Sequence, residues 1–296
     1  MLIPLDRSHI ATEQVHTKTA ALDLLSTKDF VEILSQDHEQ AVTAVQEASA
    51  TIAKFIDALH SRVIDGGRLI YIGCGTSGRL GILDAAECPP TFQSSPELIV
   101  GLIAGGDTSL RVSSEAKEDN PDGIADDFLH LDVNAKDTVL GIAAGGTTPW
   151  VVGGLELAKE RGAMTGFLTC SEVPNSVDHL LFLNTGPEPL TGSTRMKAGT
   201  ATKLALNIIT TALFTKLGKV YGNMMVDLKA SNAKLQDRAI RIVSTLCNID
   251  RQQSASLLEA AGNDVKVAIV MSKKSTDIKT ATELLLEAGG NLRSAL

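Results

Sequence analysis

The chain has 296 residues, of which 44% are hydrophobic and 21% charged, a composition typical of a globular protein with a sizeable core. Its formal net charge of −8 argues against a broad nucleic-acid-binding surface but allows a local cationic pocket for a small anion. The four cysteines at positions 74, 88, 170 and 247 form no C-x-x-C pair and have no histidine at metal-ligand spacing, so neither disulfides nor a zinc site are predicted.

Residues 28–60 carry apolar side chains at helical spacing, which predicts one or two amphipathic helices. A nearly continuous apolar run from Arg68 to Gly73 then indicates a strand buried on both faces. Similar runs, most of them followed by a helical pattern, recur at 98–104, 138–143, 164–169 and 180–183. This alternation predicts an α/β fold with a doubly wound, mainly parallel five-stranded sheet.

A long helical stretch is expected from Ser193 to Leu217, and the pattern is wholly helical from about Lys234 onward. Breaks are expected near Asn248, at Gly262–Asn263 and at Gly289–Gly290. We therefore predict three parts, which are an N-terminal helical lead-in (1–58), an α/β domain (59–222) and a C-terminal helical subdomain (223–296).

Two turns follow predicted strands and open predicted helices. In a parallel sheet such turns bind anions, because free backbone N–H groups and the helix dipole meet there. We call Gly73–Arg79 the first turn and Ala144–Pro149 the second turn. The candidate ligand-binding residues are Gly75, Thr76, Ser77, Gly78 and Arg79 in the first turn and Gly146, Thr147 and Thr148 in the second. The alternative is that both are merely tight turns.

The first turn also satisfies the G-x-G-x-x-G pattern of dinucleotide-binding proteins. Such a unit needs an acidic residue at the end of its second strand, and only Asp107, after Gly105 and Gly106, keeps that interpretation open. A Walker A loop is excluded, since no Gly-Lys-Ser/Thr follows at the required spacing.

Three segments together resemble the N-acetylmuramic acid 6-phosphate etherases, which are sugar-isomerase-type (SIS) domain proteins related to glucokinase regulatory protein. They are GTSGRL at Gly75–Leu80, LDAAECPPTF at Leu83–Phe92, and GPEPLTGSTRMK at Gly186–Lys197. The resemblance runs from about Thr12 to the end of the chain, and it makes residues 59–222 a phosphosugar-binding SIS domain.

The resemblance implies cleavage of the D-lactyl ether at C3 of N-acetylmuramic acid 6-phosphate, during recycling of cell-wall sugars. The reaction is an elimination followed by hydration, and it needs two protonatable groups but no metal or redox cofactor. The family's two acid/base glutamates fall on Glu87, the proton donor to lactate, and Glu118, the C2 base. Ser193, Arg195 and Lys197 are further candidate contacts of the sugar or its phosphate, although cations there could also simply solvate a helix end.

A glutamate that acts as an acid at neutral pH needs a raised pKa, and the weakly polar neighbours of Glu87 favour its desolvation. A helix from Ser77 to about Ala86 would separate Glu87 from the phosphate end by on the order of 15 Å. A hexose phosphate does not span that distance comfortably. We therefore expect a homodimer in which Glu87 serves the site of the partner subunit.

The second turn departs from the family, which usually has Ala-Ser-Gly-Arg-Thr-Pro-Tyr where this chain has Ala144-Gly145-Gly146-Thr147-Thr148-Pro149-Trp150. A serine hydroxyl and an arginine are thus absent. The segment Val15-His16-Thr17 likewise lacks the basic residue and Asn that the family typically has there. A non-catalytic phosphosugar-sensing regulator and an SIS-type aldose–ketose isomerase remain the alternative functions.

The start of the sequence, Met1 to Arg7, lacks the basic region and apolar core of a signal peptide. No apolar run reaches the roughly 18 residues of a membrane span. We expect a cytoplasmic protein with a phosphorylated amino-sugar substrate and with neither nucleic acid nor membrane as a partner.

Overall fold

The computed structural model describes residues 6–113, 117–228 and 233–296. Contacts divide the chain into two units. Unit 1 comprises Met1–Ala86 and Glu97–Ile209, and unit 2 comprises Glu87–Pro96 and Thr210–Leu296.

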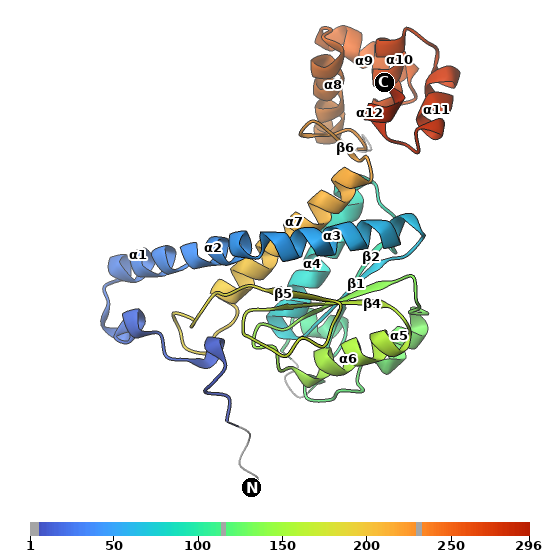
Figure 1. The fold of residues 1–296 in the computed structure, drawn as a ribbon. Coiled ribbons are helices and arrows are strands. Elements are labelled where there is room, and N and C mark those ends of the chain that lie inside the picture. The colour runs from blue at the N-terminus through green and yellow to red at the C-terminus, as the bar shows by residue number, and fades with distance from the viewer. Residues whose placement is uncertain (1–5, 114–116, 229–232) are drawn as a thin grey trace. The chain divides into compact units, whose positions relative to one another are not determined.

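A five-stranded parallel sheet forms the centre of unit 1 (Figure 1). Its strands are β1 (Leu69–Gly73), β2 (Ile99–Ile103), β3 (Thr138–Ile142), β4 (Met164–Thr169) and β5 (His179–Phe182). They lie in the order β2-β1-β3-β4-β5, and every neighbouring pair is parallel. The strand order doubles back on itself at β1, so the predicted doubly wound parallel sheet is confirmed.

Helices cover both faces of the sheet. On one face, α5 (Ala125–His130) and α6 (Pro149–Glu160) pack against β1 side chains such as Ile72. On the other lie α3 (Ser49–Ile64), α4 (Gly75–Phe92) and the first part of α7 (Lys197–Lys216). On this second face the Tyr71 hydroxyl donates to Asp84 of α4, and Asn207 of α7 donates to the other oxygen of that carboxylate.

The helix α4 is longer than expected. A helix from Ser77 to about Ala86 was expected, but α4 continues through Pro89 and Pro90 to Phe92. The two prolines lack N–H groups, yet the final turn closes because Gln93 N donates to the Pro89 carbonyl at 3.0 Å. Glu87 therefore lies on the same continuous helix as the first turn.

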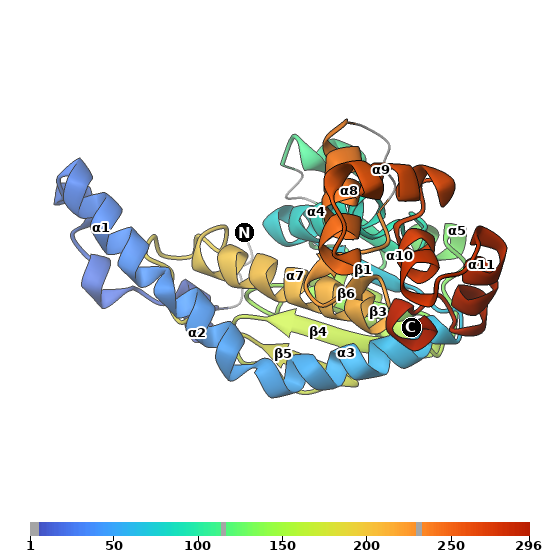
Figure 2. The ribbon, with the colours of Figure 1, turned by 90° about the horizontal axis from the view of Figure 1, so that it is seen from above.

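Three helices rather than one or two precede the sheet, namely α1 (Thr27–Asp37), α2 (Glu39–Glu47) and α3. They follow short 3₁₀ turns at η1 (Ala11–Glu13), η2 (Thr17–Thr19) and η3 (Leu22–Leu24). Figures 1 and 2 show the three helices almost end to end, with α3 along β5 and with α1 and α2 extending beyond that edge strand as an arm. No residue of α1 is buried.

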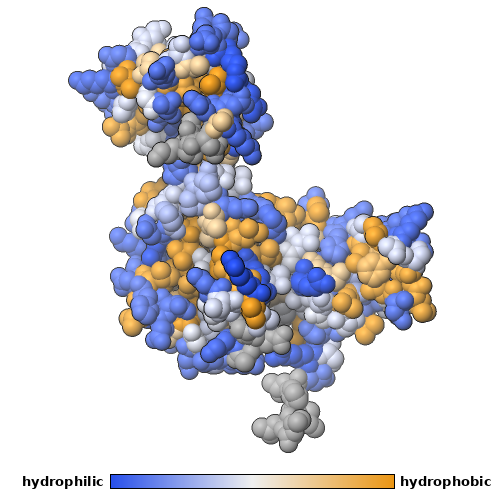
Figure 3. Space-filling view, turned by 180° about the vertical axis from the view of Figure 1, so that it is seen from behind, coloured by the Kyte–Doolittle hydropathy of each residue, from blue (hydrophilic) through white to orange (hydrophobic). Residues whose placement is uncertain are grey.

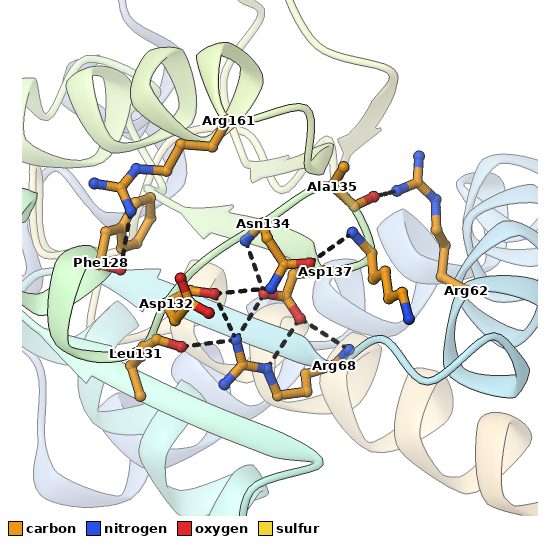
Figure 4. A network of polar contacts seen from close by, with 10 residues as sticks. Arg62, Arg68, Phe128, Leu131, Asp132, Asn134, Ala135, Asp137 and Arg161 are labelled. Carbon is orange, nitrogen blue, oxygen red and sulfur yellow. Dashed lines mark hydrogen bonds and ion pairs between the residues drawn. The ribbon is translucent and has the colours of Figure 1, made fainter.

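A polar network holds the amino-terminal ends of β1 and β3 (Figure 4). The two turns lie at the opposite, carboxyl-terminal ends of the same strands. The Arg68 guanidinium donates to both oxygens of Asp137, at 2.9 and 2.7 Å, and to the Leu131 carbonyl at 2.9 Å. The Asp137 side chain is only 2% exposed, and this bidentate pairing compensates its burial. The network holds the two central strands in register.

Unit 2 is mostly helical, as expected of the C-terminal part. It contains α8 (Ala233–Cys247), α9 (Arg251–Ala260), α10 (Val265–Lys274), α11 (Ile278–Glu287), α12 (Leu292–Ala295) and a small hairpin of β6 (Val220–Tyr221) and β7 (Met224–Met225). Positive φ angles at Asn248, Asn263 and Gly289 confirm the predicted breaks. A further break at Ser275, with φ of 52°, was not predicted. None of the helices in the described ranges has the length and apolarity that crossing a membrane requires.

Candidate functional site

The two turns lie side by side because their strands are neighbours in register. Gly73 at the end of β1 pairs with Ile142 at the end of β3, so both turns leave the sheet at the same level. Helix α4 starts at Gly75 and α6 at Pro149. Both helix starts therefore direct their positive dipole ends to one region, which suits an anion.

Two of the three glycines in the first turn, Gly75 and Gly78, are required for different structural reasons. Gly75 has φ of +52°, and a side chain there would meet nothing within 4 Å, so this glycine permits the left-handed backbone and leaves open space. A Cβ on Gly78 would lie 2.6 Å from the Gly73 carbonyl oxygen, so this glycine permits close packing of α4 on β1. Thr76 and Ser77 are half-buried.

Arg79 does not point freely toward a ligand. Its guanidinium donates to the carbonyl oxygens of Ser109 and Leu110, at 2.7 and 3.2 Å. Both carbonyls belong to η4 (Asp107–Leu110), the 3₁₀ turn after β2. Arg79 thus ties α4 to that turn, and its role as a phosphate ligand stays a prediction.

Glu118 lies beside both turns. Its carbonyl oxygen accepts a hydrogen bond from Trp150 N at 2.9 Å, which fixes its backbone against the start of α6. Its side chain also acts electrostatically on Cys74, the residue between β1 and α4. Burial raises the pKa of the Cys74 thiol to about 12, and the negative charge of Glu118 adds to that rise. The half-buried carboxylate of Glu118 therefore lies near the starts of α4 and α6.

Glu87 is exposed in the single chain. The apolar neighbours in its sequence predicted desolvation, but Ala85 and Cys88 are buried on the packed side of α4 while Glu87 lies on the open side. The chain by itself therefore does not supply the desolvation that the sequence suggested.

The second turn also combines an obligatory glycine with free hydroxyls. Gly146 has φ of +73°, and a Cβ there would lie 2.2 Å from Val173 Cγ1. Thr147 is exposed, and Thr148 is the N-cap residue of α6 but makes no side-chain capping bond. Polar donors are thus available beside the backbone amides of α6.

The Gly186–Lys197 segment is built around a carboxylate that sequence reasoning did not single out. Glu188 is fully buried, and its two oxygens accept hydrogen bonds from the backbone amides of Lys197 and Ala198, both at 2.9 Å. Burial raises the pKa of this carboxyl group above its ordinary value, although the amides and the Lys197 charge oppose the rise. Glu188 therefore caps α7.

Lys197 is engaged in a buried ion pair. Its Nζ lies 2.9 Å from Asp37 Oδ2, and its side chain is only 3% exposed. His16 Nε2 lies 2.9 Å from the other oxygen of Asp37. The three side chains border a 480 Å³ cavity between α1, α2 and the chain after β5.

The other two candidates of this segment lie apart from that ion pair. Arg195 is exposed and borders a separate 570 Å³ cavity. Ser193 is half-buried, and its backbone N–H donates to the Leu190 carbonyl at 2.9 Å. The binding roles of Ser193, Arg195 and Lys197 stay predictions.

Comparison with known proteins gives full-length relatives. N-acetylmuramic acid 6-phosphate etherases from Parasynechococcus marenigrum and Prochlorococcus marinus are 49% and 47% identical, each over 98% of this chain and 93% of the relative. The chain belongs to the N-acetylmuramic acid 6-phosphate etherase family. Another member, from Crocosphaera subtropica, is 47% identical over 98% of this chain and 96% of its own length.

Two family models match parts of this etherase-family chain. The N-terminal SIS domain of glucokinase regulatory protein matches residues 51–159, and the C-terminal lid domain of glucokinase regulatory protein matches residues 222–284. Among solved structures, phosphoheptose isomerase GmhA from Neisseria gonorrhoeae is 17% identical, with a TM-score of 0.45 over 62% of this chain and 98% of that chain.

We predict that Lys197 stabilises the fold. Lys197→Met removes the ion-pair partner of the part-buried Asp37 carboxylate, and breaking a buried pair costs about 3–5 kcal/mol. The free energy of unfolding, from urea titration, should fall by an amount of that order. Adding Asp37→Leu should recover most of the loss.

Lys28→Met serves as the control, because Lys28 pairs with Glu32 on the exposed surface of α1 and surface pairs contribute about 0–1 kcal/mol. Equal effects of the Lys28 and Lys197 substitutions would contradict a stabilising role for Lys197.

We also predict that Cys74 and Cys170 resist alkylation in the folded protein. Burial raises both thiol pKa values to about 12, so at pH 8 only about one thiol in 10⁴ is the reactive thiolate. Iodoacetamide labelling followed by peptide mass spectrometry should show both unmodified in native protein and both modified in urea. Rapid labelling of Cys74 in native protein at pH 8 would contradict the burial of its thiol.

Proposed function

We propose that this protein is an N-acetylmuramic acid 6-phosphate etherase, a carbon–oxygen lyase that releases D-lactate and N-acetylglucosamine 6-phosphate during recycling of cell-wall sugars. The single observation that carries the proposal is the position of Glu118, a carboxylate beside two helix starts that suit a phosphate. Full-length relatives that bear this name support it.

The proposed chemistry is an elimination followed by hydration. In the open-chain sugar the C1 aldehyde acidifies the C2 proton. A base removes that proton, the C3–O bond breaks, and an acid protonates the lactate oxygen as it leaves. Water then adds to C3 of the unsaturated aldehyde while a proton returns to C2. The chain needs only two carboxyl groups for these proton transfers.

We assign the C2 base to Glu118. A phosphate held by the amides of both turns would place the sugar next to this side chain. Its carboxylate is half-buried, and the backbone of Glu118 is held against the start of α6. The phosphate contacts would come from the backbone of the first turn and from the Thr76, Ser77, Thr147 and Thr148 hydroxyls.

We assign the proton donor to Glu87, acting in the site of a second subunit. Glu87 is exposed in one chain, and it lies ten positions after Ser77 on one continuous helix, about 15 Å of axial rise. Contact with a partner would supply the desolvation that the single chain lacks.

The N-terminal arm fits the same proposal. Val31 and Val42 of this arm are 58% and 46% exposed, and Leu24 in the preceding turn η3 is 81% exposed. Figure 3 shows apolar surface over this arm. An 11-residue helix such as α1, with none of its residues buried, is marginal in water by itself. Cover by a second copy of the chain would stabilise it.

We place the enzyme in the cytoplasm, where its four free cysteines would stay reduced. Phosphosugar binding is assigned to residues 59–222, between the helical lead-in (1–58) and the C-terminal helical subdomain (223–296).

The test is D-lactate release from N-acetylmuramic acid 6-phosphate. We expect Glu87→Gln and Glu118→Gln each to lower kcat by about 10²–10⁴-fold, the usual contribution of an acid or base. Asp119→Asn, which changes an exposed neighbouring carboxylate, is the matched control and should retain activity. Binding of the substrate without lactate release would favour a regulator, and a ketose product would favour an isomerase.

Mixed dimers test the shared site. A dimer of one Glu87→Gln chain and one Glu118→Gln chain contains one complete site if the two glutamates come from different subunits. Such dimers should recover about half of the wild-type activity, since one of two sites is intact. No recovery in verified mixed dimers would assign both glutamates to the same chain.

A further inference from the structure

A buried hydroxyl without a partner lies behind the second turn. Thr12, in the 3₁₀ turn η1, is 0% exposed, and its Oγ1 has no hydrogen-bond partner among the residues that the structure describes. Its backbone is held firmly, since Gly192 N donates to the Thr12 carbonyl at 3.1 Å. Leaving a buried donor unsatisfied costs about 1–3 kcal/mol, and nearly all such groups in native proteins are paired. A hydrogen-bond partner for the Thr12 hydroxyl would therefore have to come from outside the described chain, for example from a ligand.

The side chain of Thr12 faces the space beside Gly145. An ideal Cβ on Gly145 would lie 3.7 Å from Thr12 Oγ1, 3.7 Å from the Ile10 Cγ2 methyl group and 3.9 Å from Thr147 Oγ1. Two threonine hydroxyls, one buried and one exposed, thus flank the same small space. Gly145 is half-buried and Thr147 is exposed, so this space reaches the surface on the Thr147 side.

Glycine at position 145 provides room rather than backbone freedom. Its φ angle is not positive, whereas the adjacent Gly146 has φ of +73°. Every contact that a Cβ at position 145 would make is an ordinary van der Waals distance. A side chain could therefore be accommodated, and its absence leaves a gap of about one heavy atom between the two hydroxyls.

We propose that Thr12 is a substrate-binding residue whose hydroxyl donates, together with Thr147, to a phosphate oxygen that enters the gap over Gly145. This inference rests on the proposed function, because the ligand is the phosphate of its sugar substrate. The start of α6 lies next to the gap and favours an anion there. The 3₁₀ turn η1 would thereby line one side of the phosphate site.

The test compares Thr12→Val, which removes the hydroxyl but keeps the shape, with Thr12→Ser, which keeps the hydroxyl. Loss of one hydrogen bond to a charged group should raise KM about tenfold with a smaller change in kcat. The Ser variant should remain near the wild type. Without ligand, Thr12→Val should melt at the wild-type temperature or above, because it removes an unsatisfied polar group.

Thr19→Val is the matched control. The Thr19 hydroxyl is also buried but donates to the Pro189 carbonyl at 2.8 Å, so its removal should lower Tm and leave KM unchanged. Gly145→Ala is the second variant, because it fills the gap without a clash and should also raise KM. A wild-type KM in either Thr12→Val or Gly145→Ala would overturn the proposal.

A binding readout separates this inference from the proposed function. N-acetylglucosamine 6-phosphate should raise the Tm of the wild type more than that of Thr12→Val, and this comparison requires no turnover. A wild type that releases no lactate but shows this difference would contradict the etherase proposal alone. Equal Tm shifts in the two proteins would contradict the role of Thr12.

Discussion

The parallel register of β1 and β3 is the constraint on which the rest of the site depends. Because Gly73 pairs with Ile142, the two turns leave the sheet at the same level and the starts of α4 and α6 converge. The buried Arg68–Asp137 pair fixes the opposite ends of the same strands. The two turns proposed to bind an anion thereby lie side by side, with Glu118 next to them.

Two carboxylates, the buried Glu188 and the part-buried Asp37, fix the helices next to that site. Glu188 caps α7, and Asp37 pairs with Lys197 at the first residue of the same helix. The N-terminal helices are thereby connected to the segment that follows β5. Glu188 and Lys197 of the GPEPLTGSTRMK segment thus have structural roles. They fix where α7 begins and where the 3₁₀ turns at the N-terminus lie.

Much of the fold was predictable because its signals are local. Short apolar runs predicted all five strands, and asparagine and glycine residues such as Asn248 and Asn263 predicted breaks between the C-terminal helices. The break at Ser275 had no glycine or asparagine to indicate it. The continuation of α4 through Pro89 and Pro90 was missed because tertiary packing can outweigh a local preference for ending a helix.

The site was less predictable because its side chains have partners far away in the sequence. Arg79 looked available for phosphate, but the carbonyls that it contacts lie about thirty residues away in η4. Lys197 likewise meets Asp37, which no local pattern connects with it. The sequence did point to Glu118 through family resemblance, while its position between the turns and the orphan hydroxyl of Thr12 emerge only from the three-dimensional structure.

The most direct test of the account is the reaction in D₂O, with product analysis by NMR. Removal of the C2 proton by Glu118 and its return during hydration predict one solvent deuterium at C2 of N-acetylglucosamine 6-phosphate for each lactate released. Glu118→Gln should abolish both events together. Lactate release with the original C2 hydrogen fully retained would contradict the elimination mechanism and the role of Glu118.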